Sequence, residues 1–297
     1  MSLHIFANIV TPFGTAANNR GETDGNTTTL QKLIWKSQVH TTVSAEAIRF
    51  ALRRELGEGE KTNRYWDETV SENRWNDPEF KQWANFIDDD LLGYMRADAA
   101  KEESAAGTAT IRRAVLEITR AVSLTPWGGD VSFNAASPGA SPSAAKNQKD
   151  KNSKKQNPAP YMAELHATRY QYGLAMTPDR LAVKSRAATA LRAIGALRCV
   201  AGNHGRFLYD FAPEIIVLRI TDDPAPRILY CFDTPDGGKT VTAESLFQRI
   251  ESGDVLANEL FVGVSDINSS LAKQFVHQGI AISGVRKAIE DACAKIA

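Results

Sequence analysis

Apolar residues follow two kinds of pattern in the first part of this chain. Residues 3–13 are rich in Ile, Val and Phe and end in a Pro-Phe-Gly turn, which predicts a first strand leading into a loop. Residues 43–54 instead place apolar side chains at helical spacing behind Ser44, a residue type that caps helix starts well. The pattern therefore predicts a strand, a loop and an amphipathic helix in that order.

The second half of the chain alternates between the same two patterns. Helical spacing predicts helices over residues 179–199, 242–252 and 284–296. Short β-branched runs predict strands over residues 215–220, 228–232 and 259–264. Interleaved strands and helices favour an α+β or α/β fold.

An acidic segment interrupts the early part of the chain. Between Glu55 and Ala105 there are 14 Asp or Glu against 6 Lys or Arg, a balance of −8. Residues 80–95 show helical spacing, so we expect a helical insertion over residues 57–106. Asp88, Asp89 and Asp90 point in different directions on such a helix, which makes a poor metal cage and predicts a solvated acidic face.

A low-complexity stretch lies near the middle of the chain. Residues 134–160 consist mainly of Ala, Ser, Pro, Asn and Lys, with five lysines between Lys146 and Lys155. Such a composition cannot bury enough apolar surface to fold alone. Residues 131–133 and 164–176 on either side have strand character, so we expect a long hairpin with a flexible tip.

Composition narrows the function classes. No apolar run approaches the roughly 20 residues of a membrane span, and the start lacks a basic leader, so we expect a cytoplasmic protein with no membrane partner. Its three cysteines lack zinc-ligand spacing, and we expect no cofactor or metal. The net charge is zero, so the chain outside the acidic segment carries +8 and can offer a basic groove to phosphates.

Several segments, taken in order, carry a family resemblance. Residues 43–49 fit a Val-Ser-x-x-x-Ile-Arg helix start, after a glycine- and asparagine-rich loop. Residues 121–131 (Ala-Val-Ser-Leu-Thr-Pro-Trp-Gly-Gly-Asp-Val) and 202–210 (Gly-Asn-His-Gly-Arg-Phe-Leu-Tyr-Asp) complete the pattern. Together they resemble the DevR-type backbone subunit of type I CRISPR Cascade complexes, across almost the whole chain.

The resemblance implies a shape like a right hand. An RRM/ferredoxin-like palm would take residues 1–56 and 107–297, the helical fingers residues 57–106, and a flexible thumb hairpin about residues 130–165. Copies of such a subunit stack in a helical filament along the guide (crRNA), beside other Cascade subunits, and leave bases free to pair with target DNA. The chain has no aromatic run of the kind that stacks bases on an RRM sheet, so backbone contacts are expected.

Candidate RNA-binding residues fall first on the predicted helix and the segment before it. The amides behind Ser44 together with Arg49 suit a phosphate, and Arg53 lies on the same helical face. Lys32 and Lys36, four residues apart around Trp35, would share one helical face. The alternative is that these are solvated side chains on helix surfaces.

The remaining candidates lie in loops. Arg20 belongs to the glycine- and asparagine-rich loop, whose amides suit an anion. Asn203, His204 and Arg206 form a glycine-flanked loop that would allow a backbone close to a phosphate, and a helix C-cap is the alternative. The lysine cluster that includes Lys149 and Lys151 would add a salt-sensitive electrostatic attraction to the guide or the target.

We expect no catalysis, because convergent acid, base or metal groups are missing from the sequence. The Gly-Gly-Lys-Thr at residues 237–240 lacks the first glycine of a phosphate-binding loop. The more specific enzyme hypothesis is that Asp24 is catalytic, because related type III subunits cut target RNA with a metal and an aspartate in the loop after the first strand. A standalone RRM-like RNA binder is the third hypothesis.

Overall fold

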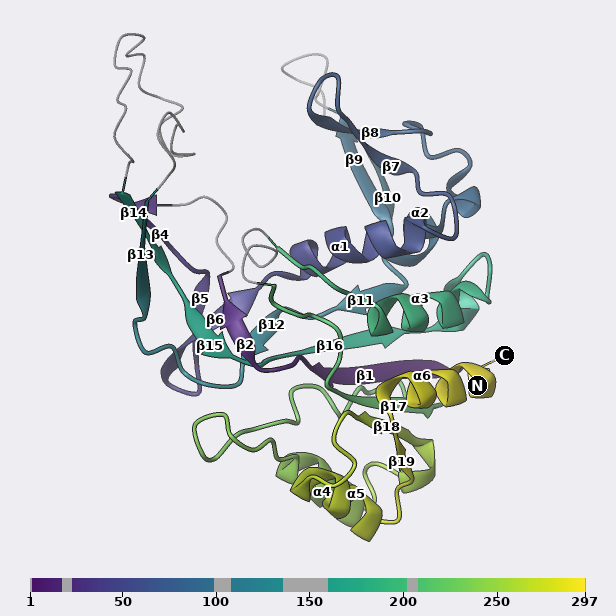
Figure 1. Ribbon diagram of the computed structural model, residues 1–297. Helices are drawn as coiled ribbons and strands as arrows, with labels where there is room; N and C mark the ends of the chain where they lie inside the picture. Colours follow the sequence, from purple (N-terminus) through teal and green to yellow (C-terminus); the bar gives the residue numbers. More distant parts are fainter. Residues whose placement is uncertain (1, 18–22, 99–107, 136–159, 202–207, 297) are drawn as a thin grey trace.

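The computed structural model describes residues 2–17, 23–98, 108–135, 160–201 and 208–296 (Figure 1). Its centre is a βαββαβ unit whose strands lie in the order β17, β1, β16, β11, each antiparallel to its neighbour. The unit consists of β1 (His4–Val10), α1 (Ala45–Gly57), β11 (Leu116–Ile118), β16 (Tyr170–Met176), α3 (Arg186–Gly195) and β17 (Ile215–Thr221). This is the ferredoxin-like arrangement, so the predicted α+β fold with an RRM-like palm is confirmed.

Further strands widen this sheet on both sides. Beside β17 lie β18 (Leu260–Val264) and β19 (Ile282–Ser283). Beyond β16 lie β12 (Ala121–Ser123), β6 (Gln38–Val43) and β5 (Lys32–Trp35). Within the described part of the chain the sheet has nine strands. The added strands extend the palm sheet beyond the four strands of the βαββαβ unit.

Side chains of β1 enter two separate cores. Ile5, Ala7 and Ile9 join the core formed with α1, α3 and α6 (Val285–Ile296). Phe6 and Val10 join the core formed with α4 (Glu244–Glu251) and α5 (Ser270–His277) on the opposite face. Because alternate side chains of a strand point to opposite faces, both faces are covered. The sheet face that an RRM uses to stack bases is thus buried under α4 and α5 in this region.

The insertion between α1 and β11 is mostly β structure. It contains two hairpins, one 3-10 turn and one short helix. These are β7 (Arg64–Asp67), β8 (Glu72–Trp75), η1 (Trp83–Asn85), α2 (Ile87–Leu92), β9 (Tyr94–Asp98) and β10 (Thr108–Arg112). The expected helical insertion is therefore wrong for most of its length.

A glycine explains why the predicted helix ends early. The helical spacing of residues 80–95 survives only in η1 and α2, because Gly93 ends α2 at φ 65° and ψ −179°, a conformation reserved for glycine. A Cβ at Gly93 would also overlap the carbonyl oxygen of Arg112 in β10. Chain reversal at Gly93 thus lets β10 pack directly behind α2.

The hairpin predicted near the middle of the chain is confirmed for its first strand, but its second strand lies at residues 160–164 rather than 164–176. β13 (Val131–Ala135) and β14 (Pro160–Glu164) pair antiparallel, with Phe133 opposite Met162. β14 also pairs with β4 (Thr27–Thr28), which pairs with β3 (Thr23–Asp24). The strand predicted over 164–176 is divided into the end of β14, then β15 (His166–Thr168), which pairs with β2 (Gly14–Ala16), and β16.

Three further predictions need correction. Lys32 and Lys36 do not share a helix, because Lys36 and Ser37 have positive φ and turn the chain between β5 and β6. Residues 228–232, predicted as a strand, form a loop held by side chains. The helix predicted from residue 179 begins only at α3, because residues 179–185 form the 3-10 turn η3 (Pro178–Arg180) and irregular chain. α5 has no counterpart among the predicted helices. None of the helices in the described residues is long and apolar enough to cross a membrane.

Candidate nucleic-acid interface

Three consecutive aspartates of α2 are buried, and two of them, Asp88 and Asp90, fasten the insertion to the palm. Asp88, Asp89 and Asp90 are 1%, 4% and 0% exposed, so the expected solvated acidic face is wrong. Asp88 accepts hydrogen bonds from the backbone N–H of Asn63 at 2.7 Å and from Arg53 Nε in α1 at 3.0 Å. The first carboxylate therefore joins the insertion to α1.

Asp90 joins the insertion to a second palm helix. Its carboxylate accepts from Arg112 Nη2 at 2.9 Å and from Arg186 Nη1 at 3.0 Å. Arg186, at the start of α3, is buried and also donates to Glu60. A buried ion pair is tolerated where charged and backbone donors satisfy the carboxylate, and the backbone N–H groups of residues 182 and 183 supply two more here.

Asp89 lies between these pairs without an arginine of its own. Its carboxylate accepts from Asn63 Nδ2 at 2.7 Å. Burial raises its pKa to about 7, with a further increase from the neighbouring Asp88 charge, while the Asn63 hydrogen bond and Arg53 act in the opposite direction. This group changes charge near neutral pH within a contact that holds two parts of the protein together.

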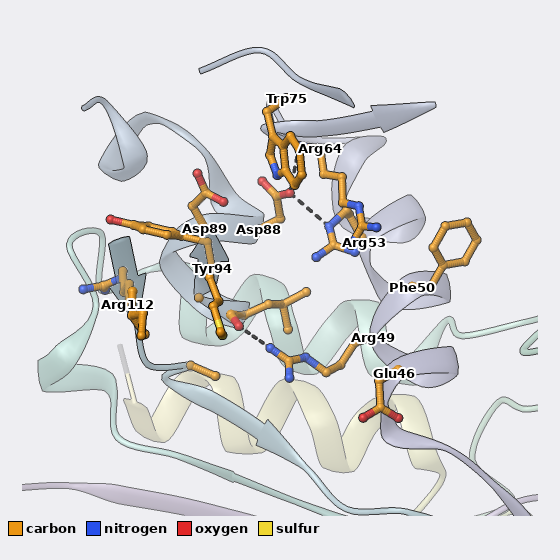
Figure 2. Close-up of a pocket in the computed structure, with 15 residues that line it drawn as sticks. Glu46, Arg49, Phe50, Arg53, Arg64, Trp75, Asp88, Asp89, Tyr94 and Arg112 are labelled. Carbon is orange, nitrogen blue, oxygen red and sulfur yellow. Dashed lines mark hydrogen bonds and ion pairs between the residues drawn. The ribbon is translucent and has the colours of Figure 1, made fainter. Parts of the chain in front are cut away.

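A cleft of about 550 Å³ opens between α1 and the insertion, next to these aspartates (Figure 2). Four arginines line it, from α1 and from two insertion strands: Arg49, Arg53, Arg64 and Arg112. Aromatic and aliphatic side chains also line it, and four of them are exposed: Phe50, Trp75, Met95 and Ile111. The cleft combines positive charge with apolar surface.

Comparison with known proteins places the chain in a family. Residues 11–195, more than half of the sequence, match the family described as the CRISPR-associated negative auto-regulator DevR/Csa2. The chain belongs to this family. A protein of Myxococcus xanthus (strain DK1622) named CRISPR-associated protein Cas7/Cst2/DevR is 58% identical over 269 residues, which cover 89% of this chain and 87% of that protein. The resemblance predicted from the sequence is confirmed.

Solved structures share the fold of this DevR/Csa2 family member. A chain of a "CRISPR RNA-guided surveillance complex, pre-nicking" matches with a TM-score of 0.61 and 11% identity, covering 100% of both chains. Another, from a "CRISPR RNA-guided surveillance complex", matches with a TM-score of 0.54 and 16% identity over 99% of both chains. At these identities the likeness is one of fold.

The predicted candidates on α1 lie at the cleft or at the start of the helix. Ser44 is the N-cap, and its side chain accepts from the N–H of Ala47, as its position predicted. Arg49 donates to the carbonyl oxygen of Leu92 at the end of α2, and Arg53 is bound to Asp88. Two predicted RNA-binding arginines thus also hold the insertion.

The two predicted lysines differ in their surroundings. Lys32 is mostly buried, pairs with Glu164 at 2.6 Å and lies 4.0 Å above the ring of Trp127. Lys36 is 58% exposed at the β5–β6 turn, where it pairs with the equally exposed Asp233. An exposed ion pair contributes at most about 1 kcal/mol, so Lys36 can exchange Asp233 for another anion at little cost.

Other predicted positions cannot be placed. Arg20, Lys149, Lys151, Asn203, His204 and Arg206 lie outside the described residues. Asp24, the alternative catalytic residue, is exposed in β3. Among the described residues, no group of three or more His, Cys, Asp or Glu side chains is arranged to hold a metal ion.

The sequence interpretation missed two arginines and an aromatic residue of the cleft. Arg64 and Arg112 lie in β7 and β10, and Trp75 in β8 lies directly opposite Arg64. The adjacent Tyr65 and Trp66 beside Arg64 were a usable strand signal, because aromatic residues are enriched in strands. The convergence of β7, β8 and β10 on α1 was not predictable, because it depends on the burial of the three aspartates.

Proposed function

We propose that this chain is the repeated guide-RNA-binding subunit of a CRISPR RNA-guided surveillance complex. Membership in the DevR/Csa2 family carries the proposal, supported by the 58% identical relative named Cas7/Cst2/DevR. The fold supports it as well, since two chains that match it over nearly their whole length come from complexes of that name. In this role, copies of the chain assemble along one guide together with other subunits, in the cytoplasm.

The covered sheet explains how such a subunit accepts any guide sequence. Base stacking on an RRM sheet requires an open face with aromatic side chains. Here α4 and α5 cover that face around β1, β17 and β18. Contacts to phosphate and sugar carry no sequence information directly, so bases stay available to pair with target DNA.

The proposal assigns the parts of the hand as the resemblance implies. The palm takes residues 1–56 and the chain from β11 onward, and the thumb is the hairpin around β13 and β14. The fingers extend from residue 57 through β10, because β10 pairs with β9. The proposed subunit holds RNA and cuts nothing. An Asp24-based ribonuclease is not favoured, because the family and the relatives in fold point to the guide-holding role.

Lys36 offers a clean test of guide contact. It is exposed, and its partner in the described part of the chain is an exposed carboxylate, so Lys36→Ala should leave the fold unchanged. Lys287 in α6 is a matched control, 70% exposed and paired with Asp291. The protein would be expressed with a guide RNA, purified, and examined by light scattering and RNA sequencing at several salt concentrations.

The expected result is multimers on guide-length RNA for the unmodified protein. Lys36→Ala should weaken binding and lower the salt slope by about one phosphate contact per copy, and Lys287→Ala should change neither. An unmodified protein that stays monomeric and RNA-free at low salt would show that the proposed function is wrong. Equal behaviour of the two variants would remove Lys36 from the interface.

A further inference from the structure

We propose that the cleft between α1 and the insertion binds one unpaired nucleotide of a single strand, with arginines at the phosphate and aromatic side chains at the base. This inference rests on the proposed function and adds a site to it. The nucleotide comes either from the guide itself or from a second strand brought to the guide. Both sources share the same chemistry, and the experiment below separates them.

Uncompensated positive charge is the first argument. Of Arg49, Arg53 and Arg64, which share one wall, only Arg53 is bound to a carboxylate. Burial lowers the pKa of both Arg49 and Arg64, and the charge of Arg53 lowers each further. A phosphate placed among the three guanidinium groups would relieve this repulsion and accept paired N–H donors.

Arg64 has unused hydrogen-bonding capacity. Its Nε is buried and lacks a hydrogen-bond partner in the part of the chain that the structure describes. Its guanidinium group forms no hydrogen bond or ion pair there, although Figure 2 shows it directed at the cleft beside Trp75. Buried polar groups in native proteins are nearly always paired, so a ligand is the natural partner.

Exposed apolar side chains form the complementary half of the site. Phe50, Trp75, Met95 and Ile111 line the cleft and are 50%, 40%, 67% and 62% exposed. Such side chains gain by covering a flat ligand, and stacking a base on an aromatic ring contributes about 1–3 kcal/mol without sequence preference. The site is also large enough, because small-molecule sites usually enclose about 300–1,000 Å³.

Three carboxyl groups also line the cleft and offset part of its positive charge. Glu46 and Asp88 are two of them, and Asp88 is engaged with Arg53. Asp89, the third carboxyl group, is about half protonated at neutral pH because burial raises its pKa to about 7. Arg112 is already paired with Asp90, so Arg49, Arg53 and Arg64 face Glu46, Asp88 and a partly protonated Asp89. The three arginines therefore outweigh the negative charge, and the cleft favours an anion over a cation.

The test compares Arg64→Gln with Arg74→Gln. Arg64 makes no side-chain bond that the substitution would break, so the variant should fold. Arg74 lies in the same hairpin, is 50% exposed, pairs with Asp67 and does not line the cleft. Each variant would be loaded with guide RNA, and the affinity for the guide and then for complementary single-stranded DNA would be measured.

We expect Arg64→Gln, but not Arg74→Gln, to weaken one of these affinities by about tenfold. A loss of guide affinity assigns the nucleotide to the guide, and a loss confined to complementary DNA assigns it to the second strand. Unchanged affinities for both would overturn the inference. So would a defect limited to assembly between copies, which would identify the cleft as a protein-docking site.

A second measurement does not depend on guide binding. The protein without guide would be titrated with a ten-nucleotide oligothymidylate, and its tryptophan fluorescence would be recorded. Quenching that is lost in Arg64→Gln and kept in Arg74→Gln supports the nucleotide site even if the chain proves not to bind guides. Quenching that is equal in both variants refutes it, whatever the guide experiments show.

Discussion

Replacing Asp89 with Asn should stabilise this protein above pH 7, and the gain should shrink towards zero as the pH falls below about 4. Asn resembles the protonated carboxyl group in shape and can still accept the hydrogen bond from Asn63. The carboxyl group of Asp89 has a pKa of about 7 in the folded protein against 3.8 as the ordinary value. A raised carboxyl pKa means that the folded state holds a proton which the unfolded state releases.

The sign of the effect follows from this difference. As the pH rises from 3.8 to 7, the unfolded chain loses its proton at this site and the folded chain keeps it, so the free energy of unfolding falls. One unit of pKa difference corresponds to about 1.36 kcal/mol. Between pH 5 and pH 8 the two pKa values therefore give a loss of about 2.5 kcal/mol, which Asp89→Asn should abolish.

Urea denaturation of both proteins at several pH values measures this difference directly. Only the difference is informative, because other groups titrate as well. Burial lowers the pKa of His166 to about 4, which makes the fold lose stability as the pH falls below 6.5 and so opposes the slope from Asp89. The term from His166 is common to both proteins and cancels.

The neighbouring carboxylate supplies the control. Asp88→Asn removes the negative partner of Arg53, so it should destabilise the fold at pH 7, whereas Asp89→Asn should stabilise it. The reasoning is refuted if the stability curves of the unmodified protein and Asp89→Asn run parallel from pH 5 to pH 8. It is also refuted if Asp89→Asn becomes less stable than the unmodified protein as the pH rises, since the carboxylate would then be needed in its charged form.

Two further substitutions test the contact between palm and insertion. Arg186→Met leaves Asp90 buried with one cationic partner fewer and should lower the free energy of unfolding by about 3–5 kcal/mol in urea titrations, and a loss below 1 kcal/mol would contradict the assigned ion pair. Gly93→Ala should lower the melting temperature measured by circular dichroism, because the added Cβ meets the carbonyl oxygen of Arg112, and an unchanged melting temperature would contradict that close approach.

Elements with local signals were predictable from the sequence. Ser44 followed by an apolar stripe predicted α1 and its cap, and the β-branched run of β17 predicted a buried strand. The first strand of the hairpin, β13, was predicted at residues 131–133 for the same reason, whereas its partner β14 lies ahead of the strand predicted over residues 164–176. In each case the residues that decide the structure are neighbours in the chain.

The β5–β6 hairpin and the buried aspartates depended on distant residues and were missed. Lys36 and Ser37 turn the chain with positive φ, although neither residue type favours that conformation. A helix with three aspartates is predicted to be solvated unless the residues that pair with those aspartates are known. Here the partner Arg186 lies 96 residues from Asp90 in the chain, and no spacing rule connects the two.

The contact between the α2 aspartates and the palm arginines explains how a chain of zero net charge can offer basic surface to a nucleic acid. Part of the acidic excess of the insertion is neutralised by palm arginines, so basic surface elsewhere is left for phosphates. Arg53 belongs to both systems, because it binds Asp88 and lines the cleft. A phosphate in the cleft would add negative charge near Asp89 and favour its protonated form.

That relation is reciprocal, as linkage between two binding events must be. The groups that act on the charge of Asp89 are the carboxylates of Asp88 and Asp77, Arg53 and the Asn63 amide, and Asp89 in turn acts on Tyr94. Each of them is fixed by the docked insertion. If an anion occupies the cleft, protonation of Asp89 strengthens its binding, so occupancy falls as the pH rises through 7. The carboxyl group that weakens the fold at high pH would then also weaken its grip on a nucleotide.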